Sequence, residues 1–143
     1  MKKIIPILQL ISVLIAFSGC EKGKTDTSPI LIMTNKGIYS VGEKIQVQLI
    51  NQSDSIANYF VCSSFNGIPP NIYKLENNSW TGYWGPICNG YSSYCCATLD
   101  PRSTYKDTLD LALTKGTYRI EYQFIVRPSH DYVSFFSNNM TVQ

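Results

Sequence analysis

A sandwich of two packed β-sheets is the fold that this 143-residue sequence predicts. Three observations support it. Apolar and polar residues alternate with a period of two in several segments, turn-forming residues separate these segments, and no window places apolar residues at helical spacing over three turns. An all-β domain of about seven or eight short antiparallel strands accounts for this pattern.

The chain begins with the layout of an export signal, which we assign to residues 1–19. Two lysines are followed by an apolar stretch (residues 4–17) and by the small residues Ser18 and Gly19. The apolar stretch is interrupted by a proline and two polar residues, and it is shorter than the roughly 20 residues that a spanning helix needs. We therefore expect export and not a spanning helix.

Cys20 follows this segment directly. The run Phe17-Ser18-Gly19-Cys20 resembles the lipobox of bacterial lipoproteins, which implies cleavage before Cys20 and acylation of its thiol. Each buried methylene contributes about 0.8 kcal/mol, so several acyl chains would anchor the protein to a membrane. The alternative is an ordinary secretory signal in which Cys20 is incidental. We expect residues 20–29, which are small and polar, to be a lipidated tether, and residues 30–143 to be the folded domain.

Charge excludes one class of partner. Of the 12 basic residues, two lie in the signal segment, which leaves ten against the 10 acidic residues. A domain that binds nucleic acid needs a clustered basic surface, so we expect no nucleic-acid partner. Aromatic residues reach 13% and charged residues only 15%, which is opposite to the composition of disordered chains.

The clearest strand lies at residues 118–126. Tyrosine, isoleucine, phenylalanine and valine occupy its even positions, whereas Arg119, Glu121 and Gln123 occupy odd positions. Such alternation is typical of a strand with one buried and one exposed face. Residues 44–49 alternate in the same way. Further strands are predicted at residues 30–34, 56–62, 72–76, 80–84, 105–111 and 133–142.

Two local patterns resemble a known domain type. The approach to Tyr118 looks like the tyrosine corner of Greek-key sandwiches, in which the phenol bonds to an upstream backbone group. Residues 35–43, with Tyr39, Gly42 and Glu43, resemble the opening of many bacterial extracellular immunoglobulin-like domains, where a Y-x-x-G-E turn joins the first two strands. The resemblance spans most of residues 34–142 and implies an immunoglobulin-like antiparallel sandwich with Greek-key connections.

Four cysteines remain besides Cys20: Cys62, Cys88, Cys95 and Cys96. In an exported protein an even count predicts two disulfides. Adjacent strand residues point to opposite faces, which favours bonding one of Cys95 and Cys96 to Cys62 and the other to Cys88. The alternative is a Cys62–Cys88 bond with a bond between the adjacent pair. No Cys-x-x-Cys spacing occurs and the single histidine, His130, is distant in sequence, so we expect no metal.

Residues 80–99 contain both tryptophans and three tyrosines between these cysteines. Tyrosine and tryptophan provide stiff, amphipathic contact area, so we expect this segment to be the contact surface. We assign Tyr83, Trp84 and Tyr91 to binding, and we expect Trp80 to pack beneath the segment as part of a small core.

No motif for catalysis, a cofactor or phosphate binding occurs. The sequence therefore favours a non-enzymatic binding or accessory lipoprotein of the bacterial cell envelope. We expect a lipid anchor in the inner or outer membrane, a domain in the periplasm or at the cell surface, and a protein or glycan ligand. The alternative is a protease inhibitor that uses residues 66–70 as an exposed loop.

Overall fold

The computed structural model describes residues 28–62, 65, 67–88 and 96–143, with the backbone alone for Cys96. The predicted signal segment and nearly all of the tether therefore lie outside the described residues. Within the described part of the chain, no helix is long and apolar enough to span a membrane.

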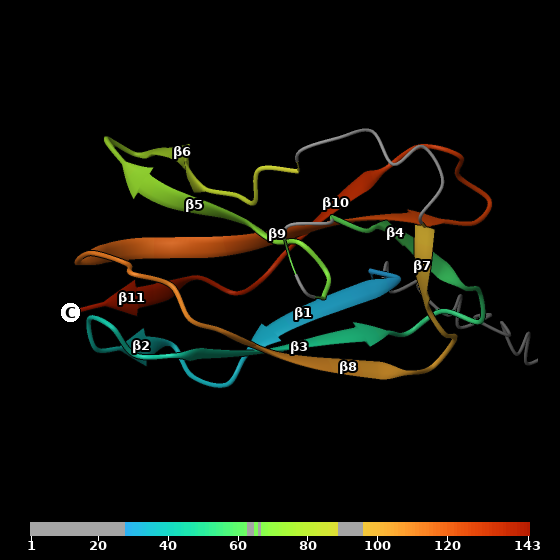
Figure 1. Ribbon diagram of the computed structural model, residues 1–143, viewed down its shortest axis with the longest axis horizontal. Helices are drawn as coiled ribbons and strands as arrows, with labels where there is room; N and C mark the ends of the chain where they lie inside the picture. The colour runs from blue at the N-terminus through green and yellow to red at the C-terminus, as the bar shows by residue number, and fades with distance from the viewer. Residues whose placement is uncertain (1–27, 63–64, 66, 89–95) are drawn as a thin grey trace, which may run out of the picture.

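The described residues form strands and no helix, as Figure 1 shows. The strands are β1 (Ile30–Thr34), β2 (Ile38–Tyr39), β3 (Ile45–Asn51), β4 (Ala57–Phe60), β5 (Asn71–Glu76), β6 (Ser79–Trp84), β7 (Cys96–Leu99), β8 (Thr104–Leu109), β9 (Gly116–Val126), β10 (Val133–Phe136) and β11 (Met140–Val142).

Two sheets pack face to face. The smaller sheet has the order β1-β3-β8 and is antiparallel throughout. In the view of Figure 1 it runs beneath β9, with the β5–β6 hairpin above. The larger sheet follows the order β2-β11-β9-β4-β7; in addition, β5 and β10 pair with β9, and β6 pairs with β5. The predicted sandwich is confirmed, with two corrections. The described residues form eleven strands and not seven or eight. In addition, β2 and β11 pair in parallel, so the larger sheet is mixed. The immunoglobulin-like strand order stays a prediction.

The long strand β9 is paired along both edges. On one edge, β11 pairs with residues 116–118 of β9 and β10 pairs with residues 121–124. On the other edge β5 pairs at residues 118–121 and β4 at Ile125 and Val126. The chain thus leaves the sheet between β4 and β5, and among the described strands none pairs with residues 122–124 on that edge. This break in the ladder positions the site described below.

The predicted alternation of β9 is confirmed. Its core-facing side chains from Tyr118 to Phe124 are fully buried, and they pack with the inward residues of β1 and β3. At the ends of several strands the predictions are wrong. The expected strand at residues 133–142 is two strands, β10 and β11. Between them, the amide of Ser137 donates to the carbonyl of Ile120 (2.8 Å) and its hydroxyl accepts from the amide of Ile120 (3.0 Å). The register then shifts, because Phe136 pairs with Glu121 but Met140 pairs with Tyr118. Strand β7 lies where we expected irregular chain.

The tyrosine corner is present. The Tyr118 hydroxyl donates to the carbonyl of Thr114 at 2.8 Å, four residues upstream, and so satisfies a backbone acceptor at the entry to β9. The ring itself is fully buried, and the hydrogen bond fixes the connection from Leu113 to the central strand.

The β5–β6 hairpin closes with two residues in the left-handed region, Asn77 (φ 50°) and Asn78 (φ 61°). Two such residues make the type I′ turn that matches the twist of paired strands. Further along, Ile72 pairs with Trp84 but Tyr73 pairs with Gly82, so Tyr83 is the extra residue of a bulge. Bulges redirect a side chain locally, and this one places Tyr83 beside the ring of Tyr118, with centroids 5.2 Å apart.

Candidate binding surface

The outward row of β9 builds the candidate site. Arg119, Glu121 and Gln123 alternate with the buried residues of the same strand, so all three lie on the outer face of the larger sheet. Across the ladder, Asn71 pairs with Glu121 and Tyr73 pairs with Arg119. The predicted exposed face of β9 is therefore covered in large part by polar and aromatic neighbours.

Glu121 is a charged residue that is only 4% exposed. Its Oε2 accepts hydrogen bonds from Asn71 Nδ2 (3.0 Å) and the Tyr73 hydroxyl (2.9 Å), and its Oε1 accepts from Gln123 Nε2 (3.4 Å). Burial alone raises the pKa of this carboxyl, but hydrogen bonds from Ser134, Tyr73, Asn71 and Gln123 together outweigh it and hold the pKa below its ordinary 4.5. The carboxylate is thus ionised at neutral pH and orients its donors.

Arg119 lies in an aromatic clamp on the same face. Its guanidinium carbon lies 4.1 Å from the ring centre of Phe136, 4.5 Å from that of Trp80 and 5.5 Å from that of Tyr73. Cation–π contacts of this kind contribute roughly 0.5–2 kcal/mol each. They fix β6, β9 and β10 relative to one another across the outer face.

A pocket of about 260 Å³ opens at the break between β4 and β5. We call it the amide pocket, because Asn71 and Gln123 contribute side-chain amides to its lining. Phe60 and Tyr132, which are 36% and 45% exposed, contribute rings to its wall. Its described lining is Phe60, Ile68, Pro69, Asn71, Pro86, Cys88, Gln123 and Tyr132.

Both amides of the pocket have their orientation set by Glu121. Each uses one N–H to bond the carboxylate, so the amide oxygen and the second N–H are directed elsewhere. The oxygen of Asn71 also has little room, since a Cβ at Gly85 would lie 2.8 Å from it. The absence of a side chain at Gly85 therefore leaves room for the Asn71 oxygen in its present position.

A second hollow of about 390 Å³ adjoins the pocket and shares Asn71 with it. We call it the tryptophan hollow; its lining is Asn71, Ile72, Tyr73, Gly82, Tyr83, Trp84 and Gly85. Two of the residues that we assigned to binding, Tyr83 and Trp84, lie here and are each 37% exposed. Trp84 also contacts the ring of Phe65, with centroids 6.2 Å apart.

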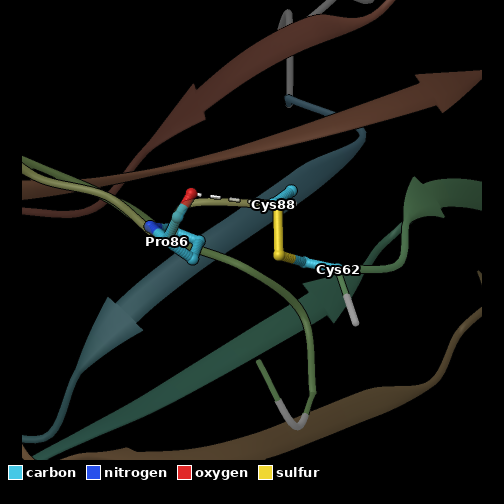
Figure 2. The surroundings of a disulfide bond; sticks show 3 residues. All are labelled: Cys62, Pro86 and Cys88. Atoms are coloured by element: carbon cyan, nitrogen blue, oxygen red, sulfur yellow. Dashed lines mark hydrogen bonds between the residues drawn. A yellow bond between two sulfur atoms is a disulfide. The ribbon is translucent and has the colours of Figure 1, made fainter. Parts of the chain in front are cut away.

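A disulfide joins Cys62 to Cys88, with their Cα atoms 5.2 Å apart (Figure 2). The expected pairing of these two cysteines with Cys95 and Cys96 is therefore wrong, and the bond is the one in the alternative scheme. The reason is topological: β4 and β6 lie on opposite sides of the break in the ladder and run toward it from opposite directions, so the residues that follow the two strands meet there. Figure 2 also shows the Cys88 sulfur facing the carbonyl of Pro86, 3.8 Å away. The bond ties together two walls of the amide pocket.

The other sequence-derived assignments have mixed outcomes. Tyr91 and Cys95 lie outside the described residues, and Cys96 is the first residue of β7. Trp80 is half-buried, as expected for a packed ring, but it packs on Arg119 at the outer sheet face and is not part of the buried core. His130 is exposed, as a solvated turn residue should be.

The alternative inhibitor loop is corrected. We expected residues 66–70 to be exposed. Asn66 lies outside the described residues, but Ile68 is only 1% exposed and belongs to the hydrophobic core. Pro70 is buried as well, and Pro69 forms part of the pocket wall. An inhibitor loop must present its central side chain to a protease, and the side chain of Ile68 is buried.

Sequence reasoning missed most of the pocket. The period of two placed Glu121 and Gln123 on one face, but Asn71 lies 50 residues away from Glu121 and Tyr132 lies in a turn. Only the register between β5 and β9 brings Asn71 to Glu121, and Tyr132 reaches the pocket from the connection between β9 and β10. Among the described residues, no group of three or more His, Cys, Asp or Glu side chains could hold a metal ion.

Comparison with known proteins was made for the whole chain. No protein-family model matches it, and no curated protein matches it significantly. Among solved structures, the sporulation control protein Spo0M from Bacillus subtilis matches with a TM-score of 0.41 and 10% identity. The match covers 80% of this chain and 48% of that chain, so this chain spans about half the length of that protein.

We predict that Glu121→Gln destabilises the protein at pH 7 by about 1–3 kcal/mol, because a neutral amide brings its own N–H donors against those of Asn71 and Gln123. The folded-state pKa of Glu121 is lowered, so its ionisation stabilises the fold above pH 4.5, and that stability is lost as pH falls through the lowered pKa. Urea unfolding at pH 7 and at pH 3 measures both effects.

The matched control is Glu76→Gln on the exposed end of β5, which should change stability by no more than about 0.5 kcal/mol. The difference in free energy of unfolding between the wild type and Glu121→Gln should be smaller at pH 3 than at pH 7. Equal stability of the two at pH 7, or a difference that does not change with pH, would contradict the assigned role of the carboxylate.

Proposed function

We propose that this chain is a non-enzymatic, lipid-anchored binding or accessory protein of the bacterial cell envelope. The folded domain presents the amide pocket and the tryptophan hollow to a ligand, and Cys20 carries the anchor. The part of the predicted contact surface that lies in described residues, Tyr83 and Trp84, belongs to the tryptophan hollow.

The observation that carries the binding function is the preorganised lining of the amide pocket. Ligand sites combine apolar or aromatic walls with a few fixed polar groups. Here, rings and prolines form the walls, and two amides are held by a buried carboxylate. A buried, ionised carboxylate costs free energy unless it is fully hydrogen-bonded, so a network of this kind supports a role beyond folding.

Two features support export. The first is the layout of residues 1–20, with its resemblance to lipoprotein signals. The second is the Cys62–Cys88 bond, since disulfides persist in oxidising compartments and are rare in the cytosol. The proposed anchor and the disulfide are both consistent with a folded domain on the outer side of the cytoplasmic membrane.

The lipid anchor is tested by expressing the full-length chain in a bacterium that processes lipoproteins. We expect the wild type to enter the detergent phase on partition and its mass to match an acylated chain that begins at Cys20. Cys20→Ser should stay in the aqueous phase, because the acyl chains that partition into detergent are missing. Cys62→Ser, the control for replacement of a cysteine outside the signal, should partition as the wild type does. An unacylated wild type would refute the anchor.

The binding function is tested by fragment screening of the full-length chain with NMR, using small neutral fragments that carry a ring or hydroxyl groups. Hits should gather at Phe60, Tyr132 and Trp84, because these sites combine walls with fixed polar groups. The internal control is a hollow of about 470 Å³ on the smaller sheet, lined by Gln46, Val47, Gln48, Lys106, Asp107 and Thr108. This hollow is larger, so hits gathered there, or spread evenly, would refute the assigned surface.

A further inference from the structure

We infer that the amide pocket binds a sugar unit of a neutral glycan, which Asn71 and Gln123 hold by hydrogen bonds. The inference rests on the proposed binding function and adds the chemical class of the ligand. Four properties of the pocket lead to it: the hydrogen-bonding groups left free by Glu121, the ring walls, the lack of charge in the lining and the continuation into the tryptophan hollow.

The hydrogen-bonding groups favour hydroxyls. One N–H of each amide is taken by Glu121, at 3.0 Å for Asn71 and 3.4 Å for Gln123. Each amide then offers one acceptor oxygen and one remaining donor. A hydroxyl group is both donor and acceptor, so two neighbouring hydroxyls of a sugar ring match two such amides.

The walls favour a ligand with an apolar face. Phe60 and Tyr132 present partly exposed rings, and Pro69 and Pro86 present apolar ring edges. A sugar ring has hydroxyls around its edge and C–H groups on its faces. Such a ring can pack its faces on aromatic or proline surface while its edge reaches the amides.

The lining favours a neutral ligand. None of the eight described lining residues is Asp, Glu, Lys or Arg. Glu121 lies beneath the amides and is already hydrogen-bonded, so it offers no free charge. A charged ligand group would lose hydration here without gaining an opposite charge.

A proline-rich peptide is the competing macromolecular ligand, since such peptides also dock on aromatic surface. Proline has no N–H, so it cannot donate to the two amide oxygens. An amide oxygen that the bound ligand covers and leaves without a donor costs about 1–3 kcal/mol. The orientation that Glu121 imposes on the amides therefore favours the sugar.

The continuity of the two hollows favours more than one sugar unit. The amide pocket and the tryptophan hollow share Asn71, and the second hollow adds the half-exposed rings of Tyr83 and Trp84. A single unit in the pocket would leave this neighbouring aromatic surface for the next unit. We therefore expect an oligosaccharide to bind more tightly than its monosaccharide.

The experiment is a binding measurement of the full-length chain, purified in mild detergent, against a panel of immobilised neutral oligosaccharides. The panel contains glucose, mannose, galactose, xylose and N-acetylglucosamine oligomers of two to six units. A proline-rich peptide of similar length is the competing probe. We expect saturable binding to at least one oligosaccharide and none to the peptide.

Two variants locate the site. Gln123→Ala removes one amide from an exposed position, and Gly85→Ala adds a Cβ that displaces the Asn71 oxygen without removing any group. Each should weaken binding about five- to tenfold, as expected for one or two lost hydrogen bonds. Gln46→Ala, the same change on an exposed position of the smaller sheet, is the matched control and should leave affinity unchanged.

The outcomes separate the two proposals. Binding to an oligosaccharide that both pocket variants weaken supports the glycan inference. Binding to the peptide alone, weakened by Gln123→Ala, overturns the glycan inference and keeps the proposed binding surface. Oligosaccharide binding that Gln123→Ala and Gly85→Ala do not weaken overturns the pocket assignment, and a folded wild type that binds no panel member overturns the inference.

Discussion

The pairing of β9 along both edges is the constraint on which the rest of the structure depends. Its inner row, from Tyr118 to Phe124, is fully buried between the sheets. Since side chains alternate, the outer row is fixed by the same register: a slip of one residue would turn Arg119 and Glu121 into the core between the sheets and Ile120 to the outer face. The outer face therefore inherits the rigidity of the core. A binding surface built on it loses little conformational freedom when a ligand arrives.

Two further interactions convert this rigid row into a pocket. From beneath, the Glu121 carboxylate collects donors from β5, β9 and β10 and so fixes the amides. At the rim, the Cys62–Cys88 bond joins the segments that follow β4 and β6. The pocket lies where the ladder beside β9 is interrupted. The carboxylate orients the two amides of the pocket, and the disulfide joins the segments on either side of the break.

The sequence predicts the strands well because their period of two is a local property. The faces of β3 and β9, the tyrosine corner at Tyr118 and the turn at Asn77 all follow from neighbouring residues. The pocket does not follow, because Asn71 meets Glu121 only through strand register. The predicted disulfide pairing was wrong for the same reason. It relied on the local alternation at Cys95 and Cys96, whereas the partner of Cys62 is determined by where β4 and β6 end in the fold. Exposure of residues 66–70 was wrong because a loop rich in proline and glycine can still insert an isoleucine, Ile68, into the core.

The pocket depends on one interaction above all: an ionised Glu121 holds the side-chain amides of Asn71 and Gln123 in place. An NMR pH titration that follows the Glu121 carboxyl carbon and both side-chain NH₂ groups tests it most directly. We expect all three signals to shift together, with one midpoint below the ordinary 4.5 of a glutamate. A midpoint at or above that value, or NH₂ signals that do not respond as the carboxyl takes up its proton, would contradict the account.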